Sequence, residues 1–141
     1  MPRADFYLID KPRFREQPLL LVCELAKRGY AANLSILVLA RDAAQAEAID
    51  DLMWSFDPDE YLPHQIAGMD EGDDDTPILI ATPDMDIPAR PMLLNLRDAA
   101  PTGTFERVLE VVPADPSARA PLRERWKHYQ ALGFEVNKHD M

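Results

Sequence analysis

Residues 34–54 read LSILVLARDAAQAEAIDDLMW and carry the clearest signal of the fold class. The near-continuous apolar run Leu34–Leu39 predicts a strand that is covered on both faces, as in a parallel sheet. Asp42 is placed to cap a helix over residues 43–54, and Gln45 three residues later completes a capping box. A buried strand followed directly by a helix is the repeating unit of α/β proteins.

The same alternation extends along the chain in both directions. Apolar, β-prone runs predict further strands over residues 6–9, 77–81, 92–96 and 108–112, with an edge strand over 134–136. Helices are expected over residues 19–28, ending at Gly29, and from a cap at Asp115 through Leu132. Turns and loops are expected over residues 12–18, 56–63, 70–75 and 83–88.

The last helix contains Pro121, which either bends it or lies in its first turn. With 141 residues and no internal repeat or linker, the chain predicts one domain over residues 1–141. The expected architecture is a three-layer α/β fold, with a mostly parallel sheet and helices on both faces.

Charge is unevenly distributed. The net charge is −10, and between Asp42 and Asp86 there are 14 Asp or Glu residues without any Lys or Arg. Because nucleic-acid affinity comes from cations that neutralise phosphates, strong direct binding to nucleic acid is not expected. Residues 117–132 have a net charge of +3, opposite in sign to the rest of the chain. They contain one Glu and four cations: Arg119, Arg123, Arg125 and Lys127. Such a strip is either a solvated helix face or a site for an acidic partner.

The remaining bulk features indicate a cytoplasmic protein. The single cysteine, Cys23, cannot form an internal disulfide, which suits a reducing compartment. No apolar run approaches the roughly 18 residues of a membrane span, and no signal-peptide core follows Met1. We expect no membrane association.

The sequence lacks the motifs of a nucleotide site. Its five glycines are too far apart for GxGxxG, and none precedes Lys-Ser or Lys-Thr as a P-loop requires. The turn after the first predicted strand reads Asp10-Lys11-Pro12-Arg13 and has no glycine. No cofactor is therefore expected.

Metal and nucleophile chemistry are equally unsupported. The three histidines have no partner at ligand spacing: His64, His128 and His139. Cys23 lies among apolar neighbours in a predicted helix, which favours a buried structural thiol. The serines have no evident histidine base. The chain is therefore expected to be non-catalytic.

Two residue groups remain as candidate binding sites. Large side chains gather at the end of the third predicted helix and in its following loop, as an exposed patch or a cluster folded beneath the loop: Trp54, Phe56, Tyr61, Leu62, Pro63 and His64. On the last helix one face carries cations beside an aromatic ring: Arg119, Arg123, Trp126, Lys127 and Gln130. The opposite stripe is the expected core side: Ala118, Leu122, Tyr129 and Leu132. The cationic face suits an acidic peptide with an aromatic end.

The sequence resembles the chi subunit of the bacterial DNA polymerase III holoenzyme over essentially its whole length. The resemblance depends on the order and spacing of several short stretches: FYLID (6–10), LVCELA (21–26), Trp54 with YLPH (61–64), VVP (111–113), RERWKHY (123–129) and Gly133-Phe134.

This resemblance implies a Rossmann-like fold without a nucleotide site, and a non-catalytic accessory role at the clamp loader in DNA replication. It implies two partners: the psi subunit, in a 1:1 heterodimer that tethers the chain to the clamp loader, and the acidic, Phe-terminated C-terminal tail of single-stranded-DNA-binding protein. The implied tail site is Val112, Arg119, Arg123, Trp126, Lys127 and Gln130. The implied psi surface is Trp54, Tyr61, Leu62, Pro63 and His64.

The chain departs from the family pattern at two tail-site positions. Gln130 stands where relatives can carry a cation, and Trp126 where they can carry Tyr. The alternative interpretation is a small nucleotide- or metabolite-binding enzyme of Rossmann-like shape.

Overall fold

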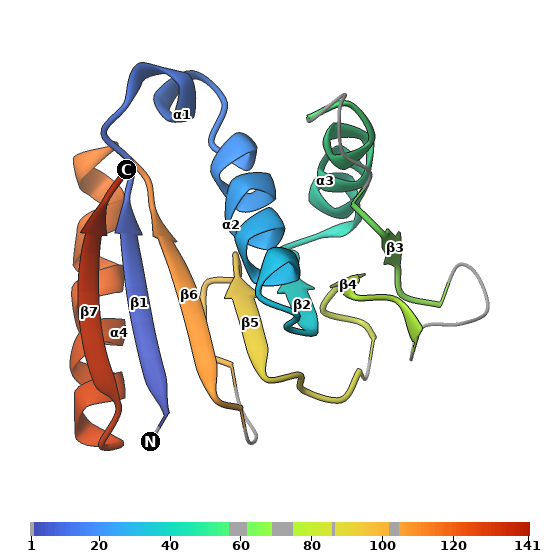
Figure 1. Ribbon diagram of the computed structural model, residues 1–141. Coiled ribbons are helices and arrows are strands. Elements are labelled where there is room, and N and C mark those ends of the chain that lie inside the picture. The colour runs from blue at the N-terminus through green and yellow to red at the C-terminus, as the bar shows by residue number, and fades with distance from the viewer. Residues whose placement is uncertain (1, 57–61, 69–74, 86, 102–104) are drawn as a thin grey trace.

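The computed structural model describes residues 2–56, 62–68, 75–85, 87–101 and 105–141 (Figure 1). Its described strands form one seven-stranded sheet in the order β3-β4-β2-β5-β6-β1-β7, and every pair of neighbours is parallel. The strands are β1 (Arg3–Leu8), β2 (Ile36–Leu39), β3 (His64–Ile66), β4 (Ile78–Ala81), β5 (Met92–Asn95), β6 (Arg107–Val112) and β7 (Glu135–Asp140). The sheet is therefore fully parallel where a mostly parallel one was predicted.

Helices cover both faces of the sheet. The described α-helices are α1 (Pro12–Glu16), α2 (Leu19–Ala31), α3 (Ala43–Ser55) and α4 (Arg119–Ala131). α2 and α3 lie on one face and α4 on the other, behind β1 and β7 in Figure 1. The predicted three-layer α/β architecture is confirmed. None of the described helices is long and apolar enough to cross a membrane.

The predicted strand and helix of residues 34–54 form as expected. All four residues of β2 are buried, and the strand pairs with β4 on one side and β5 on the other. At the start of α3, the backbone N–H of Gln45 donates to the Asp42 carboxylate at 2.8 Å. The Gln45 side-chain oxygen in turn accepts the backbone N–H of Arg41 at 2.7 Å, one residue before the cap.

Gly29 does not end its helix, contrary to the prediction. α2 continues to Ala31, with Gly29 buried inside it. A Cβ at Gly29 would lie 2.7 Å from Ile36 Cδ1 and 2.9 Å from Met92 Sδ. The glycine is therefore needed for close packing of α2 on the sheet.

Several other boundaries differ from the predictions. The first strand starts at Arg3 and excludes Ile9, and the predicted turn over residues 12–18 contains the short helix α1. The edge strand β3 begins directly after the predicted loop over residues 56–63, where no strand was predicted. β7 runs from Glu135 to Asp140, beyond the predicted residues 134–136. Most of the two predicted loops over residues 56–63 and 70–75 lies outside the described residues.

The last helix shows how its proline is accommodated. Asp115 caps a short 3-10 helix, η2 (Pro116–Ala118), by accepting the backbone N–H of Ser117 at 3.0 Å. The α-helix proper begins at Arg119. Pro121 is thus its third residue, within the first turn, where no intrahelical hydrogen bond is lost.

Candidate functional site

A groove of about 680 Å³ runs between α4 and the sheet. Its lining includes all six residues of the tail site implied by the family resemblance: Val112, Arg119, Arg123, Trp126, Lys127 and Gln130. Four further residues complete it: Phe6 and Leu8 of β1, Leu122 of α4 and Lys138 of β7.

The floor of the groove is apolar because of strand register. Leu8 of β1 lies opposite Val112 of the neighbouring strand β6, so both side chains lie on the same face of the sheet. Phe6, two residues before Leu8, shares that face and packs against Trp126, with ring centroids 5.0 Å apart. Trp126 is half-buried; it packs against the core and also lines the groove.

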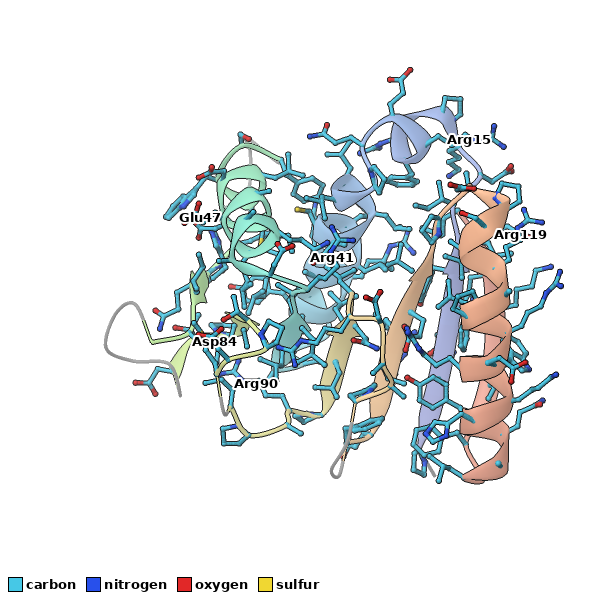
Figure 2. All side chains as sticks on the ribbon, turned by 180° about the vertical axis from the view of Figure 1, so that it is seen from behind. Arg15, Arg41, Glu47, Asp84, Arg90 and Arg119 are labelled. Carbon is cyan, nitrogen blue, oxygen red and sulfur yellow. The ribbon has the colours of Figure 1, made fainter. Side chains whose placement is uncertain are left out.

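Cations border this floor. Arg119, Arg123 and Lys127 follow one another at four-residue spacing along α4 and are exposed; Arg119 is labelled near the start of α4 in Figure 2. Lys127 lies 3.5 Å from Glu124 in a surface ion pair. Arg119 and Arg123 form no ion pair with another described residue. An apolar floor beneath a row of cations can hold an apolar side chain and adjoining carboxylates.

Arg125, counted in the same cationic strip, has a different role. Its side chain is 8% exposed and donates to Glu110 Oε1 at 2.7 Å. The other carboxylate oxygen, Oε2, accepts Tyr129 Oη at 2.5 Å and Asn95 Nδ2 at 3.0 Å. Burial raises the pKa of Glu110 above its ordinary value, although Arg125 and these hydrogen bonds oppose the shift. The network fixes α4 to the sheet, and Arg125 does not reach the groove.

The predicted core stripe of α4 is correct only in part. Tyr129 is buried, whereas Leu132 is 59% exposed. Leu122 is half-buried and lines the groove. Arg125 is buried as well, which the sequence analysis did not predict because the side chain is charged.

The group around Trp54 divides between surface and interior. Trp54 is 59% exposed, while Leu62 and His64 are buried, which corrects their expected place on a binding surface. His64 Nδ1 donates to the Leu62 carbonyl at 2.6 Å, and its Nε2 lies 3.2 Å from Asp50 Oδ1. The His64 ring packs edge-on to Trp54, with centroids 4.8 Å apart.

The remaining members of that group follow the same division. Pro63 is half-buried and Phe56 packs partly against the core. Tyr61 lies outside the described residues. The described part of this group is therefore divided: Leu62 and His64 are buried, and Trp54 presents an aromatic surface.

The carboxyl end of β1 is where many parallel α/β proteins bind phosphate. Here the backbone N–H groups of Asp10 and Lys11 donate to the backbone oxygen of Met141, at 2.6 and 2.9 Å. α1 begins with Pro12, which has no N–H to offer. These amides are thus already occupied by the chain itself.

The metal-ligating side chains of the described part of the chain are dispersed. No group of three His, Cys, Asp or Glu there is arranged to hold a metal ion. Cys23 is buried in α2, and burial raises its thiol pKa to about 12.

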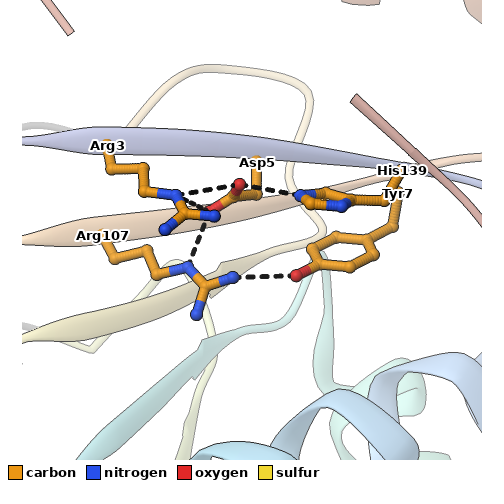
Figure 3. A network of polar contacts seen from close by, with 5 residues as sticks. All are labelled: Arg3, Asp5, Tyr7, Arg107 and His139. Carbon is orange, nitrogen blue, oxygen red and sulfur yellow. Dashed lines mark hydrogen bonds and ion pairs between the residues drawn. The ribbon is translucent and has the colours of Figure 1, made fainter. Parts of the chain in front are cut away.

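A second polar network lies on the opposite face of β1 from the groove (Figure 3). The buried carboxylate of Asp5 accepts hydrogen bonds from Arg3, from Arg107 Nε at 2.6 Å and from His139 Nε2 at 2.9 Å. Arg107 also donates to Tyr7 Oη at 2.8 Å. Burial alone would raise the pKa of Asp5, but the hydrogen bonds outweigh it and hold this pKa below its ordinary value. The network links β1 to β6 and β7.

The fold resembles that of a chain in a solved Saccharomyces cerevisiae complex of Dbp5 with Gle1 and ADP. The TM-score is 0.63 at 15% identity, over 99% of this chain and 42% of that one. At this identity the likeness concerns the fold alone.

Sequence comparisons are more specific. Proteins named DNA polymerase III subunit chi match over most of their length. The one from Escherichia coli K12 is 33% identical over 147 residues, covering 97% of each chain. The one from Pseudomonas aeruginosa PAO1 is 29% identical over 143 residues, covering 99% of this chain and 96% of that one. A third, from Haemophilus influenzae Rd, is 28% identical and covers 83% of each.

The family model described as DNA polymerase III chi subunit, HolC, matches residues 1–137, from the first strand of the sheet into the edge strand β7. The resemblance inferred from short stretches therefore holds over nearly the whole chain, which belongs to the DNA polymerase III chi subunit family.

Proposed function

We propose that the chain is a non-catalytic accessory subunit of the clamp loader, which joins a psi subunit to the C-terminal tail of single-stranded-DNA-binding protein. The observation that carries this proposal is the groove along α4, in which an apolar floor adjoins Arg119, Arg123 and Lys127. Membership of the chi family supports a role in DNA replication, and that role supports a cytoplasmic location.

The groove fits the chemistry of an acidic tail that ends in phenylalanine. A terminal Phe ring would occupy the recess between Val112 and Trp126, and its carboxylate would pair with a nearby arginine. Arginine suits this task because its planar guanidinium binds carboxylates through two parallel hydrogen bonds. The Asp residues that precede the Phe in the tail would lie along the remaining cations of the groove.

Calorimetric titration with an acidic peptide ending in Pro-Phe tests the tail site. Arg123→Ala should weaken binding about tenfold or more, because a partly desolvated charge-assisted hydrogen bond is worth roughly 1.5–3 kcal/mol. Removing the terminal Phe should weaken binding at least as much. Affinity should also fall with salt, since the cations are exposed. Equal binding by wild type and Arg123→Ala at low and high salt would refute the site.

The proposed psi surface centres on Trp54. An exposed tryptophan at the end of a helix can act as an interface anchor, and truncating such an anchor commonly costs about 2 kcal/mol or more of binding free energy. Trp54→Ala should abolish co-purification of the psi subunit in a 1:1 complex while the thermal midpoint changes little. Tyr61→Ala should behave in the same way. Retained psi binding with a large loss of stability would assign these side chains to the fold.

Absence of catalysis is part of the same proposal. The backbone amides of Asp10 and Lys11 after β1 already donate to Met141, which supports this part of the proposal. Saturable micromolar binding of ATP or NAD would contradict the proposal and favour a nucleotide-binding enzyme.

A further inference from the structure

The groove has a second wall, formed by the edge strand β7. In the parallel pairing of β1 with β7, Lys138 lies opposite Phe6. Paired residues of neighbouring strands point to the same face of a sheet, so Lys138 lies beside the aromatic floor made by Phe6 and Trp126. Lys138 and the cations of α4 thus border the same groove from different elements.

The Lys138 charge is available to a ligand. Its side chain is exposed and makes no ion pair with another described residue. Its neighbours on the same face of β7 are Val136, which is half-buried, and Asp140, which does not line the groove.

The row of cations on α4 has a defined length. Arg119 and Lys127 are eight residues apart, which at 1.5 Å per residue is about 12 Å along the helix axis. An extended peptide covers this length with about four residues at roughly 3.3 Å each. At the end of the row beyond Lys127, the groove residue on α4 is the uncharged Gln130.

We propose that Lys138 pairs with an acidic side chain of the bound tail from the β7 side of the groove, across from the cations of α4. This inference rests on the proposed function of the groove and adds that the acidic segment lies between α4 and β7. An acidic residue several positions before the terminal aromatic ring would face Lys138. In this arrangement Lys138 of the edge strand contacts the acidic residues of the tail, while α4 and the apolar floor bind its aromatic end.

The test compares Lys138→Gln with the matched control Lys11→Gln, which removes another exposed lysine outside the groove. Both variants change the net charge by the same amount, so a long-range charge effect would weaken both equally. The probe is a peptide of four Asp residues followed by Pro-Phe, titrated at low salt. We expect Lys138→Gln to weaken binding about threefold and Lys11→Gln by less than about 1.5-fold, as is typical of exposed ion pairs.

A double-mutant cycle then locates the contact. Each Asp of the peptide is replaced in turn by Asn, and one of these peptides should bind wild type and Lys138→Gln equally well. Lys138→Gln should leave the thermal midpoint unchanged, because the side chain is exposed.

The inference is overturned if Lys138→Gln binds every peptide as wild type does, or no more weakly than Lys11→Gln. If Arg123→Ala still weakens binding in that case, the proposed tail site stands without Lys138. Absence of peptide binding to the wild type would overturn both.

Discussion

Replacing Arg125 by methionine should destabilise the protein strongly. Glu110 is fully buried, and Arg125 is its ion-pair partner at 2.7 Å. Loss of one partner of a buried ion pair typically costs about 3–5 kcal/mol, because the other charge remains buried without compensation. That is a large part of a typical unfolding free energy of about 5–15 kcal/mol.

Urea denaturation followed by circular dichroism measures this cost. With a slope of about 2 kcal/mol per molar urea, the midpoint of Arg125→Met should fall by roughly 1.5–2.5 M. Lys127→Met is the matched control, since it breaks the exposed pair with Glu124 on the same helix. That control should change stability by less than about 0.5 kcal/mol.

A second substitution should restore part of the loss. Glu110→Gln removes the uncompensated charge and keeps an oxygen that can accept from Tyr129. The double variant should therefore be more stable than Arg125→Met, with a coupling of about 0.5–3 kcal/mol. If Arg125→Met lay within about 1 kcal/mol of wild type, or the double variant were less stable than the single one, the pair would not anchor α4.

Three further results are expected. The pKa of Asp5 in the folded state lies below its ordinary 3.8. The ionised carboxylate therefore adds to the free energy of unfolding above pH 3.8, and this contribution is lost as the pH falls through the folded pKa. The stability difference between wild type and Asp5→Asn should therefore narrow from pH 5 downward in acid titrations of urea unfolding; a constant difference would contradict this. Cys23, with a thiol pKa of about 12, should react with a thiol reagent only after denaturation, and rapid labelling of the native protein would show local opening. Gly29→Ala should cost about 1–3 kcal/mol in urea unfolding, because a Cβ there meets Ile36 and Met92; a more stable variant would mean that α2 can shift.

Elements with strong local signals were predictable from the sequence. The four buried residues of β2 form a continuous apolar run. Asp42 and Gln45 are residue types typical of a helix start, and they cap α3 as expected. The strand β3, by contrast, reads His-Gln-Ile and is a strand only through its pairing with β4. Gly29 carries the usual signal for a helix end, but packing of α2 against β2 and β5 overrides it.

The candidate site was predictable to the extent that it lies on one helix. Helical periodicity places Arg119, Arg123 and Trp126 on one face, and the groove brings them together. Lys138 was missed because no local signal says that the last strand pairs with the first. Only the register that sets Lys138 beside Phe6 brings this lysine to the groove.

Arg123 and Arg125 show why charge alone could not define the binding surface. Two residues along a helix correspond to a rotation of about 200°, so these side chains point to nearly opposite sides of α4. Glu110 on β6 holds one of them in the interior, and the other faces the groove. The groove therefore lacks Arg125, which the sequence had placed in the cationic strip, and gains Lys138 from β7. An acidic partner that lay only along α4 would not contact this lysine. A partner that uses every cation of the groove therefore has to reach both α4 and β7.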